Sequence, residues 1–231
     1  LLRVFIVLRY NMCTHFVVTK GMKLMADTHI KYNDHSISSA FKDHYIVPDY
    51  QREYVWTDEQ VEQLMADLLD AYNTDNKKAY FLGTIVTYDS GSQFELIDGQ
   101  QRLTTFFVLL CAIKKFYVNC GEQTSVIENL IYSPTMNSEG DVINLYHLQL
   151  QYEDAGNCLE LIEKGQERPN YLTQSGERLF DAFQTIQDFL SERFGFCLEA
   201  VCFRTEQLCF RCCRRIFRRQ DFHLCCCRFH L

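Results

Sequence analysis

Residues 94–105 read Phe-Glu-Leu-Ile-Asp-Gly-Gln-Gln-Arg-Leu-Thr-Thr, and this stretch decides the fold. The alternating run from Gln93 to Ile97 predicts a short strand, and Asp98-Gly99 is a turn signal. From Gln100 onward the apolar residues follow a helical period. The sequence therefore predicts a strand, a tight turn and a helix, with four polar side chains gathered at the turn.

The predicted turn has the features of an anion site. A helix that begins there directs free N–H groups and the positive end of its dipole at the space in front of it. Arg102 adds a fixed charge with donors suited to phosphate, and Gly99 allows a ligand to approach the backbone. Gln100 and Gln101 offer uncharged donors and acceptors, and Asp98 is suited to hold Mg²⁺ or orient a water. We interpret the turn as a nucleotide site; the alternative is a plain turn with a capped helix and a surface arginine.

A second candidate lies upstream, where residues 47–56 read Val-Pro-Asp-Tyr-Gln-Arg-Glu-Tyr-Val-Trp. Arg52 is expected to bring a second positive group to the same ligand. Tyr50 and Trp56 have rings that stack on bases, although for the aromatic residues we favour core packing.

The residues after this segment predict an amphipathic helix and a hairpin. Thr57 and Gln60 have the spacing of a capping box. The helix that follows presents one apolar stripe, made of Val61, Leu64, Met65, Leu68, Leu69 and Tyr72. Residues 80–88 are rich in β-branched and aromatic side chains, and residues 89–92 supply the turn of a hairpin.

The helix that begins at Gln100 is expected to bury one side, formed by Leu103, Phe106, Phe107, Leu110, Ile113 and Phe116. Lys114 and Lys115 are expected in its last turn, where the helix dipole favours them. The rest of the chain predicts, in order, a loop-like or weakly helical connector over 121–140, a strand over 145–152, a short helix over 157–163 and a final helix capped by Ser175.

Composition limits the class of protein. The chain has 231 residues, with 18 Phe and 13 Tyr, which is ample material for the core of one large domain or one and a half ordinary ones. The net charge of −7 argues against a general nucleic-acid-coating protein, while a local basic groove remains compatible with it. No apolar run reaches the roughly 18 residues that a membrane span needs.

Both ends of the chain differ in texture from the body. Residues 1–24 begin with Leu and carry a short apolar patch interrupted by Arg9, which we interpret as upstream translated sequence in preference to a signal peptide. Eight of the 12 cysteines and seven arginines lie in residues 196–231. We interpret this tail as non-native or disordered sequence, such as a shifted reading frame. The alternatives are a basic nucleic-acid patch or a zinc site using Cys209, Cys212 and His223, Cys225 or His230.

Three motifs in order resemble one family. They are Val47-Pro-x-Tyr-Gln-Arg-x-Tyr-x-Trp56, Phe81-Leu-Gly-x-Ile-Val86 and Ile97-Asp-Gly-Gln-Gln-Arg-Leu-Thr-Thr105. Together they closely resemble the N-terminal domain of GmrSD-type, modification-dependent restriction endonucleases. The resemblance implies an α+β fold: a ParB/sulfiredoxin-like small mixed sheet with packed helices over 25–120, and a mainly helical continuation over 121–195.

The resemblance also implies a function. Related enzymes hydrolyse NTPs, often GTP, and couple this to cutting foreign modified DNA. The implied catalytic residues are Asp98, Gln100, Gln101 and Arg102, and the implied nucleotide-binding residues are Tyr50, Gln51, Arg52, Gly99 and Arg102. With Asp98 as the Mg²⁺ ligand, we expect a cytoplasmic, NTP-binding and NTP-hydrolysing regulatory domain of a phage-defence restriction protein.

The chain departs from the family in one respect. The family usually continues into a second helical part and a His-Asn-His-type nuclease domain, and no such nuclease motif is present here. We therefore expect a truncated regulatory half whose nuclease is supplied elsewhere. Two alternatives remain open: a ParB-like DNA-binding module without NTPase activity, and an inactive fragment.

Overall fold

The computed structural model describes residues 16–21, 31–74, 80–152 and 155–194. The chain divides into two compact units, Leu1–Leu190 and Ser191–Leu231, and everything below except the end of the last helix belongs to the first. The strands are β1 Phe16–Gly21, β2 Lys31–His35, β3 Tyr45–Val47, β4 Gly83–Asp89, β5 Phe94–Asp98, β6 Tyr132–Met136, β7 Val142–Tyr146 and β8 Leu148–Leu150. The helices are α2 Ile37–Ala40, α3 Asp58–Thr74, α4 Gln100–Asn119, α5 Ser125–Ile131, α6 Ala155–Glu163 and α7 Gln174–Phe194. Helices and strands are intermixed along the chain, which confirms the α+β class.

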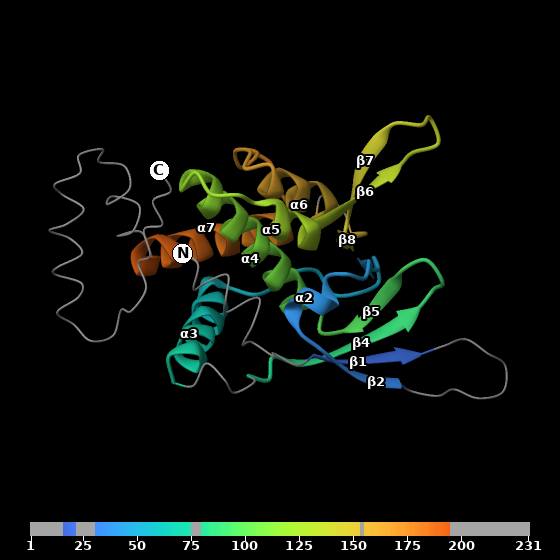
Figure 1. Ribbon diagram of the computed structural model, residues 1–231, viewed down its shortest axis with the longest axis horizontal. Coiled ribbons are helices and arrows are strands. Elements are labelled where there is room, and N and C mark those ends of the chain that lie inside the picture. The colour runs from blue at the N-terminus through green and yellow to red at the C-terminus, as the bar shows by residue number, and fades with distance from the viewer. Residues whose placement is uncertain (1–15, 22–30, 75–79, 153–154, 195–231) are drawn as a thin grey trace, which may run out of the picture. The chain divides into compact units, whose positions relative to one another are not determined.

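The larger sheet has the strand order β2-β1-β4-β5-β3-β8 (Figure 1). It is mixed: β1 runs antiparallel to β2 and parallel to β4, and β4 and β5 form an antiparallel hairpin. β3 pairs in parallel with both β5 and β8. Strands β6 and β7 form a separate two-stranded hairpin, which Figure 1 shows rising away from β4 and β5. Because β8 belongs to the larger sheet, part of that sheet comes from residues beyond 120.

Strand β1 lies within residues 1–24, which the sequence led us to interpret as upstream translated sequence. Phe16 pairs with His35 of β2 on one side and with Gly83 of β4 on the other. The origin of residues 1–24 and the domain boundaries remain predictions.

The region around the 89–92 turn matches the prediction closely. β4 and β5 form the expected hairpin, with a register shift between Val86 and Thr87. Helix α4 begins at Gln100, directly after the Asp98-Gly99 turn. One half of the predicted capping box of α3 is present, since the Thr57 backbone N–H donates to the Gln60 side chain at 2.8 Å. The Gln60 N–H donates to the Thr57 backbone carbonyl at 3.1 Å.

Helix α4 is buried on all its faces along most of its length, whereas the sequence predicted one buried side. Thr104, Thr105, Val108, Leu109, Cys111 and Ala112 are buried together with the predicted apolar residues. Such an all-round apolar helix belongs to the centre of a core. In the structure α4 contacts both α5 and α6.

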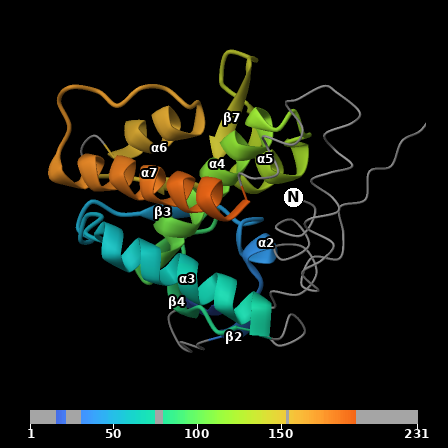
Figure 2. The same cartoon turned by 90° about the vertical axis from the view of Figure 1, so that its left-hand side faces the viewer.

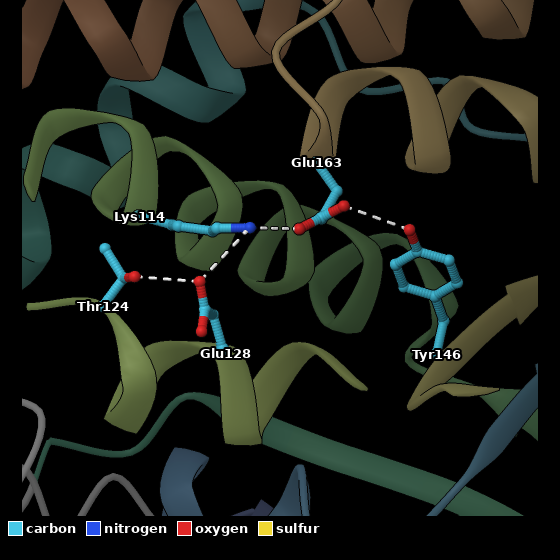
Figure 3. A network of polar contacts seen from close by, with 5 residues as sticks. All are labelled: Lys114, Thr124, Glu128, Tyr146 and Glu163. Atoms are coloured by element: carbon cyan, nitrogen blue, oxygen red, sulfur yellow. Dashed lines mark hydrogen bonds and ion pairs between the residues drawn. The ribbon is translucent and has the colours of Figure 1, made fainter. Parts of the chain in front are cut away.

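Helix α4 also continues beyond the expected last turn, to Asn119, so Lys114 lies one turn further inside than predicted. Its ammonium group forms an ion pair and hydrogen bond with Glu163 of α6 and lies 3.6 Å from Glu128 of α5 (Figure 3). Glu163 also accepts a hydrogen bond of 3.1 Å from the Tyr146 hydroxyl, and Thr124 donates to Glu128 at 2.8 Å. We call these five residues the Lys114 cluster. Its polar contacts join α4, α5, α6 and β7.

Predictions for the C-terminal half were partly wrong. The 121–140 connector contains the helical turn that was one of its two expected forms, α5, but it also contains strand β6, which was not expected. The predicted 145–152 strand is divided between β7 and β8. Ser175 does not cap α7, because it is buried inside the first turn. Thr173 caps the helix instead: its carbonyl accepts from the Glu177 N–H at 2.9 Å and its hydroxyl from the Gly176 N–H at 3.2 Å. Figure 2 shows α7 lying between α6 and α3.

His147 is the residue between β7 and β8, and it is buried. It is 2% exposed, its Nε2 lies 2.6 Å from the Ser133 hydroxyl and its Nδ1 3.1 Å from the Leu130 carbonyl. Its ring also packs edge-on against His44, with centroids 4.7 Å apart. Burial, and then the neighbouring charge of His44, lower the pKa of His147, while hydrogen bonds to backbone carbonyls and the charge of Asp43 act against this shift. The folded protein therefore favours the neutral ring.

This lowered pKa predicts an acid-sensitive stability. The unfolded chain takes up a proton at His147 near the ordinary value of about 6.5, whereas the folded protein does so only at lower pH. The free energy of unfolding is therefore expected to fall as pH drops below about 6.5, by at most roughly 1.4 kcal/mol per pH unit for this one proton. Urea titrations of the unaltered chain and of His147→Gln between pH 5 and 8 measure it. Parallel pH dependences of the two proteins would contradict the prediction.

Among the helices of the described residues, none is both long and apolar enough to cross a membrane.

Candidate functional site

Gly99 joins the end of β5 to the start of α4, and its φ is +88°. A Cβ atom at this position would lie 2.9 Å from the Thr84 carbonyl oxygen and 3.0 Å from Ile85 Cγ1. The contact with the carbonyl oxygen is closer than a real Cβ atom makes, and the contact with Ile85 is tight. The left-handed conformation adds strain for any residue with a Cβ. The sequence therefore needs glycine here to turn from β5 into α4 while lying against β4.

In the described part of the chain, no side chain caps the first turn of α4. The first N–H groups of a helix have no intrahelical partner, so they and the positive end of the dipole remain available to an anion. Asp98, the last residue of β5, is exposed beside them and pairs in register with Val86 of β4. The turn thus combines an exposed carboxylate with uncapped backbone donors.

The Arg102 guanidinium lies across the start of β4. Its Nη1 is 3.4 Å from the Thr84 carbonyl oxygen, which is a long hydrogen bond. A Cβ at Gly83 would lie only 2.3 Å from the same nitrogen, so glycine at that position leaves the room that the guanidinium occupies. The side chain is half-buried, and within the described part of the chain no other hydrogen bond or ion pair of this guanidinium is found. A guanidinium has further donors that suit a phosphate.

Gln101 is used differently from its neighbours. Its Oε1 accepts a hydrogen bond of 2.8 Å from the Val55 N–H, and its Nε2 donates one of 2.8 Å to the Glu53 carbonyl. The residue is 7% exposed. Its amide therefore joins α4 to the irregular segment 50–56.

Tyr54 anchors the same segment from inside the core. Its side chain is fully buried, and its hydroxyl lies 2.9 Å from the Thr105 hydroxyl, which itself donates to the Gln101 carbonyl at 2.8 Å. The Tyr54 N–H donates to the Ser175 hydroxyl of α7 at 3.1 Å. The side chain of Tyr152 forms a hydrogen bond with the same serine. Burial raises the pKa of Tyr152 to about 12, so its hydroxyl stays neutral. Sequence reasoning missed this network, because a period of apolar residues does not indicate which buried hydroxyls meet.

The other predicted residues lie at the surface, or their side chains form no hydrogen bond that is found among the described residues. Tyr50 is 67% exposed and Arg52 is exposed, so Tyr50 is not part of the core and is accessible to a ligand. Gln51 is half-buried, and its N–H donates to the Pro48 carbonyl at 3.0 Å in a turn. Gln100 is 9% exposed, and within the described residues no hydrogen bond to its side chain is found.

Within the described ranges, no group of three or more His, Cys, Asp and Glu side chains is placed to hold a metal ion. A magnesium ion bound mainly by substrate phosphates and one carboxylate does not need such a group, and the exposed Asp98 fits that role. The zinc ligands considered for the tail lie outside the described residues.

The structure thus defines an α+β domain in which a strand, a glycine turn and a central helix present one carboxylate, one guanidinium and uncapped amides. Comparison with protein families gives a match to the family described as GmrSD restriction endonuclease, N-terminal domain, over residues 33–222. The chain belongs to this family. The match extends into the Cys- and Arg-rich tail, whose origin remains a prediction. No curated protein matches the chain.

Proposed function

We propose that this chain is an NTP-binding and NTP-hydrolysing regulatory domain of a modification-dependent DNA restriction protein, with its site at the β5–α4 junction. The observation that carries the proposal is the uncapped start of α4 flanked by Asp98 and Arg102. Phosphate binding needs such backbone donors and a guanidinium, and hydrolysis needs a carboxylate to hold Mg²⁺ or a water.

Each residue has a role that its position supports. Arg102 binds the phosphates and neutralises charge that develops on the transferred phosphoryl oxygens. Asp98 holds Mg²⁺ or orients the attacking water, and Gln100 orders the nucleotide. Arg52 adds a second positive charge, and the exposed ring of Tyr50 offers a stacking surface for the base.

Family membership supports the wider setting. Restriction endonucleases act on DNA, which supports modified or foreign DNA as a partner. We propose the nucleotide and a nuclease as the further partners. We propose GTP with Mg²⁺ as the ligand and the cytoplasm as the location, as the resemblance of the three motifs implies. The nuclease would be supplied by another domain or subunit.

Replacing Arg102 with alanine is the direct test. Hydrogen bonds to charged groups contribute about 1.5–3 kcal/mol, so the affinity for GTP with Mg²⁺ is expected to fall roughly 10- to 100-fold. Isothermal titration calorimetry on the full chain measures the loss. Arg178→Ala, which removes a half-buried arginine from α7, is the matched control and should leave the affinity unchanged.

Two outcomes would contradict the proposal. Unchanged GTP affinity in Arg102→Ala would show that the nucleotide does not bind at the β5–α4 junction. Binding of duplex DNA with a steep salt dependence and no effect of nucleotide would instead indicate the ParB-like DNA-binding module.

A further inference from the structure

We propose that Gln101 is a positioning residue that fixes Arg52 at the nucleotide site, and that its side chain does not contact the nucleotide. This inference rests on the proposed function and assigns the two glutamines of the Asp-Gly-Gln-Gln-Arg motif to different tasks.

The Gln101 amide is committed to the backbone on both of its polar atoms. Oε1 accepts from the Val55 N–H and Nε2 donates to the Glu53 carbonyl, each at 2.8 Å. These are the donor and acceptor that a neighbouring β-strand would satisfy, so one side chain takes the place of a strand. Turning this buried amide towards a ligand would leave both backbone groups without their partner, which is costly. A direct contact with nucleotide is therefore disfavoured.

Segment 50–56 has no regular structure of its own to hold it. Residues 52–57 belong to no helix, strand or turn. The anchors of this stretch among the described residues include the Gln101 amide, the Ser175 hydroxyl, the Tyr54–Thr105 hydroxyl contact and the hydrogen bond of the Tyr152 side chain to the Tyr54 backbone. Gln101 anchors the residue that follows Arg52, through its bond to the Glu53 carbonyl, while the residue before Arg52 is held by the local turn between Gln51 and Pro48.

Arg52 itself needs such an anchor. Its side chain is exposed, and no ion pair with another described residue holds it. A long side chain on an irregular segment loses conformational freedom when it binds, and a fixed backbone reduces that cost. Gln101 thus links the two positive groups of the site: it lies beside Arg102 on α4 and holds the backbone that carries Arg52.

A thermodynamic cycle tests the assignment. Gln101→Met keeps the length of the side chain and removes both hydrogen bonds. GTP affinity is measured by calorimetry for the unaltered full chain, Arg52→Ala, Gln101→Met and the double variant. We expect each single variant to lose about tenfold in affinity, and Gln101→Met to lose less than about twofold further when Arg52 is already alanine, because residues that act through one another are not additive.

Hydrogen exchange tests the anchor independently of any ligand. In Gln101→Met, amide exchange over residues 52–56 is expected to accelerate, while exchange in α3 stays unchanged. Gln63→Met removes the Gln63–Asp67 side-chain bond of α3 and is the matched control, with no effect expected on exchange over 52–56 or on GTP affinity. If Gln101→Met folds poorly, Gln101→Glu takes its place in the test. This variant retains the acceptor for the Val55 N–H but loses the donor to the Glu53 carbonyl, so intermediate exchange and affinity are expected.

The possible failures are distinguishable. Equal affinity losses from Gln101→Met with and without Arg52 would indicate direct nucleotide contact and overturn the inference, as would unchanged exchange over 52–56. An Arg52→Ala variant with full affinity, beside a weakened Arg102→Ala, would overturn the inference and leave the proposed function standing. If the unaltered chain binds no GTP, both fall.

Discussion

Replacement of Lys114 with methionine is expected to destabilise the fold by about 3 kcal/mol, because it leaves a buried carboxylate without its counter-ion. The side chain of Glu163 is 6% exposed and that of Lys114 is 17% exposed, so neither charge is fully solvated in the folded protein. Burial alone would lower the pKa of Lys114, but its hydrogen bond to Glu163 and the nearby carboxylates outweigh burial and raise it. The lysine is therefore charged in the folded state and compensates Glu163.

The remaining contacts of the Lys114 cluster cannot replace this partner. The Tyr146 hydroxyl still donates to Glu163 at 3.1 Å, but it brings no positive charge. Burial, followed by the charge of Glu163, already raises the pKa of that tyrosine. Without Lys114, the Glu163 carboxylate would have to be protonated or hydrated, and either change reduces the free energy of unfolding.

Urea unfolding followed by circular dichroism measures the effect. Adding Glu163→Gln to Lys114→Met removes the uncompensated charge, so the double variant is expected to be more stable than Lys114→Met alone. Lys164→Met is the matched control: it breaks the exposed ion pair with Glu160 and should have a far smaller effect. Equal midpoint shifts for Lys114→Met and Lys164→Met would show that the cluster behaves like a surface ion pair.

Substitution of Gly99 by alanine is the second large effect expected, with a loss of about 3 kcal/mol. Part of the loss is the left-handed backbone at φ +88°, which costs roughly 1–2 kcal/mol for a residue with a Cβ. The rest comes from the contacts at 2.9 Å with the Thr84 carbonyl oxygen and at 3.2 Å with Ile85 Cα. Both are backbone atoms of β4, so relief requires the strand itself to move.

Gly140 provides a control that separates the two contributions. It has the same φ of +88°, but a Cβ there would meet nothing within 4 Å. Gly140→Ala should therefore show only the conformational cost, roughly 1–2 kcal/mol, and the difference between the variants measures the contact with β4. If both substitutions shift the urea midpoint equally, the close approach of Gly99 to β4 is not a source of stability.

Local signals in the sequence were sufficient for the elements around the site. The hairpin turn at 89–92, the Asp98-Gly99 turn and the start of α4 at Gln100 each depend on a few neighbouring residues, and the structure has all three. The bond from the Thr57 N–H to the Gln60 side chain at the start of α3 was predictable for the same reason.

Features that depend on distant residues were not predictable from the sequence. The burial of α4 on every face depends on α5 and α6, which lie beyond the helix in the chain. Serine is a common helix-capping residue, yet the Ser175 hydroxyl accepts a hydrogen bond from the backbone N–H of Tyr54, 121 residues away in the chain. The role of the Gln101 amide is of the same kind, since its partners are 46 and 48 residues away. Residue type indicated that these groups needed partners, and only the fold shows which ones they have.

The parallel pairing of β3 with β8 has a consequence for how the chain folds. Tyr45 pairs with Leu148, so β3 can pair with β8 only after about a hundred further residues have been synthesised. Until β8 arrives, the outer side of β3 presents free N–H and C=O groups, which are a template for pairing with another chain. Pairings of such long sequence separation also close slowly. The newly synthesised domain therefore passes through a stage at which misassociation competes with completion of the sheet.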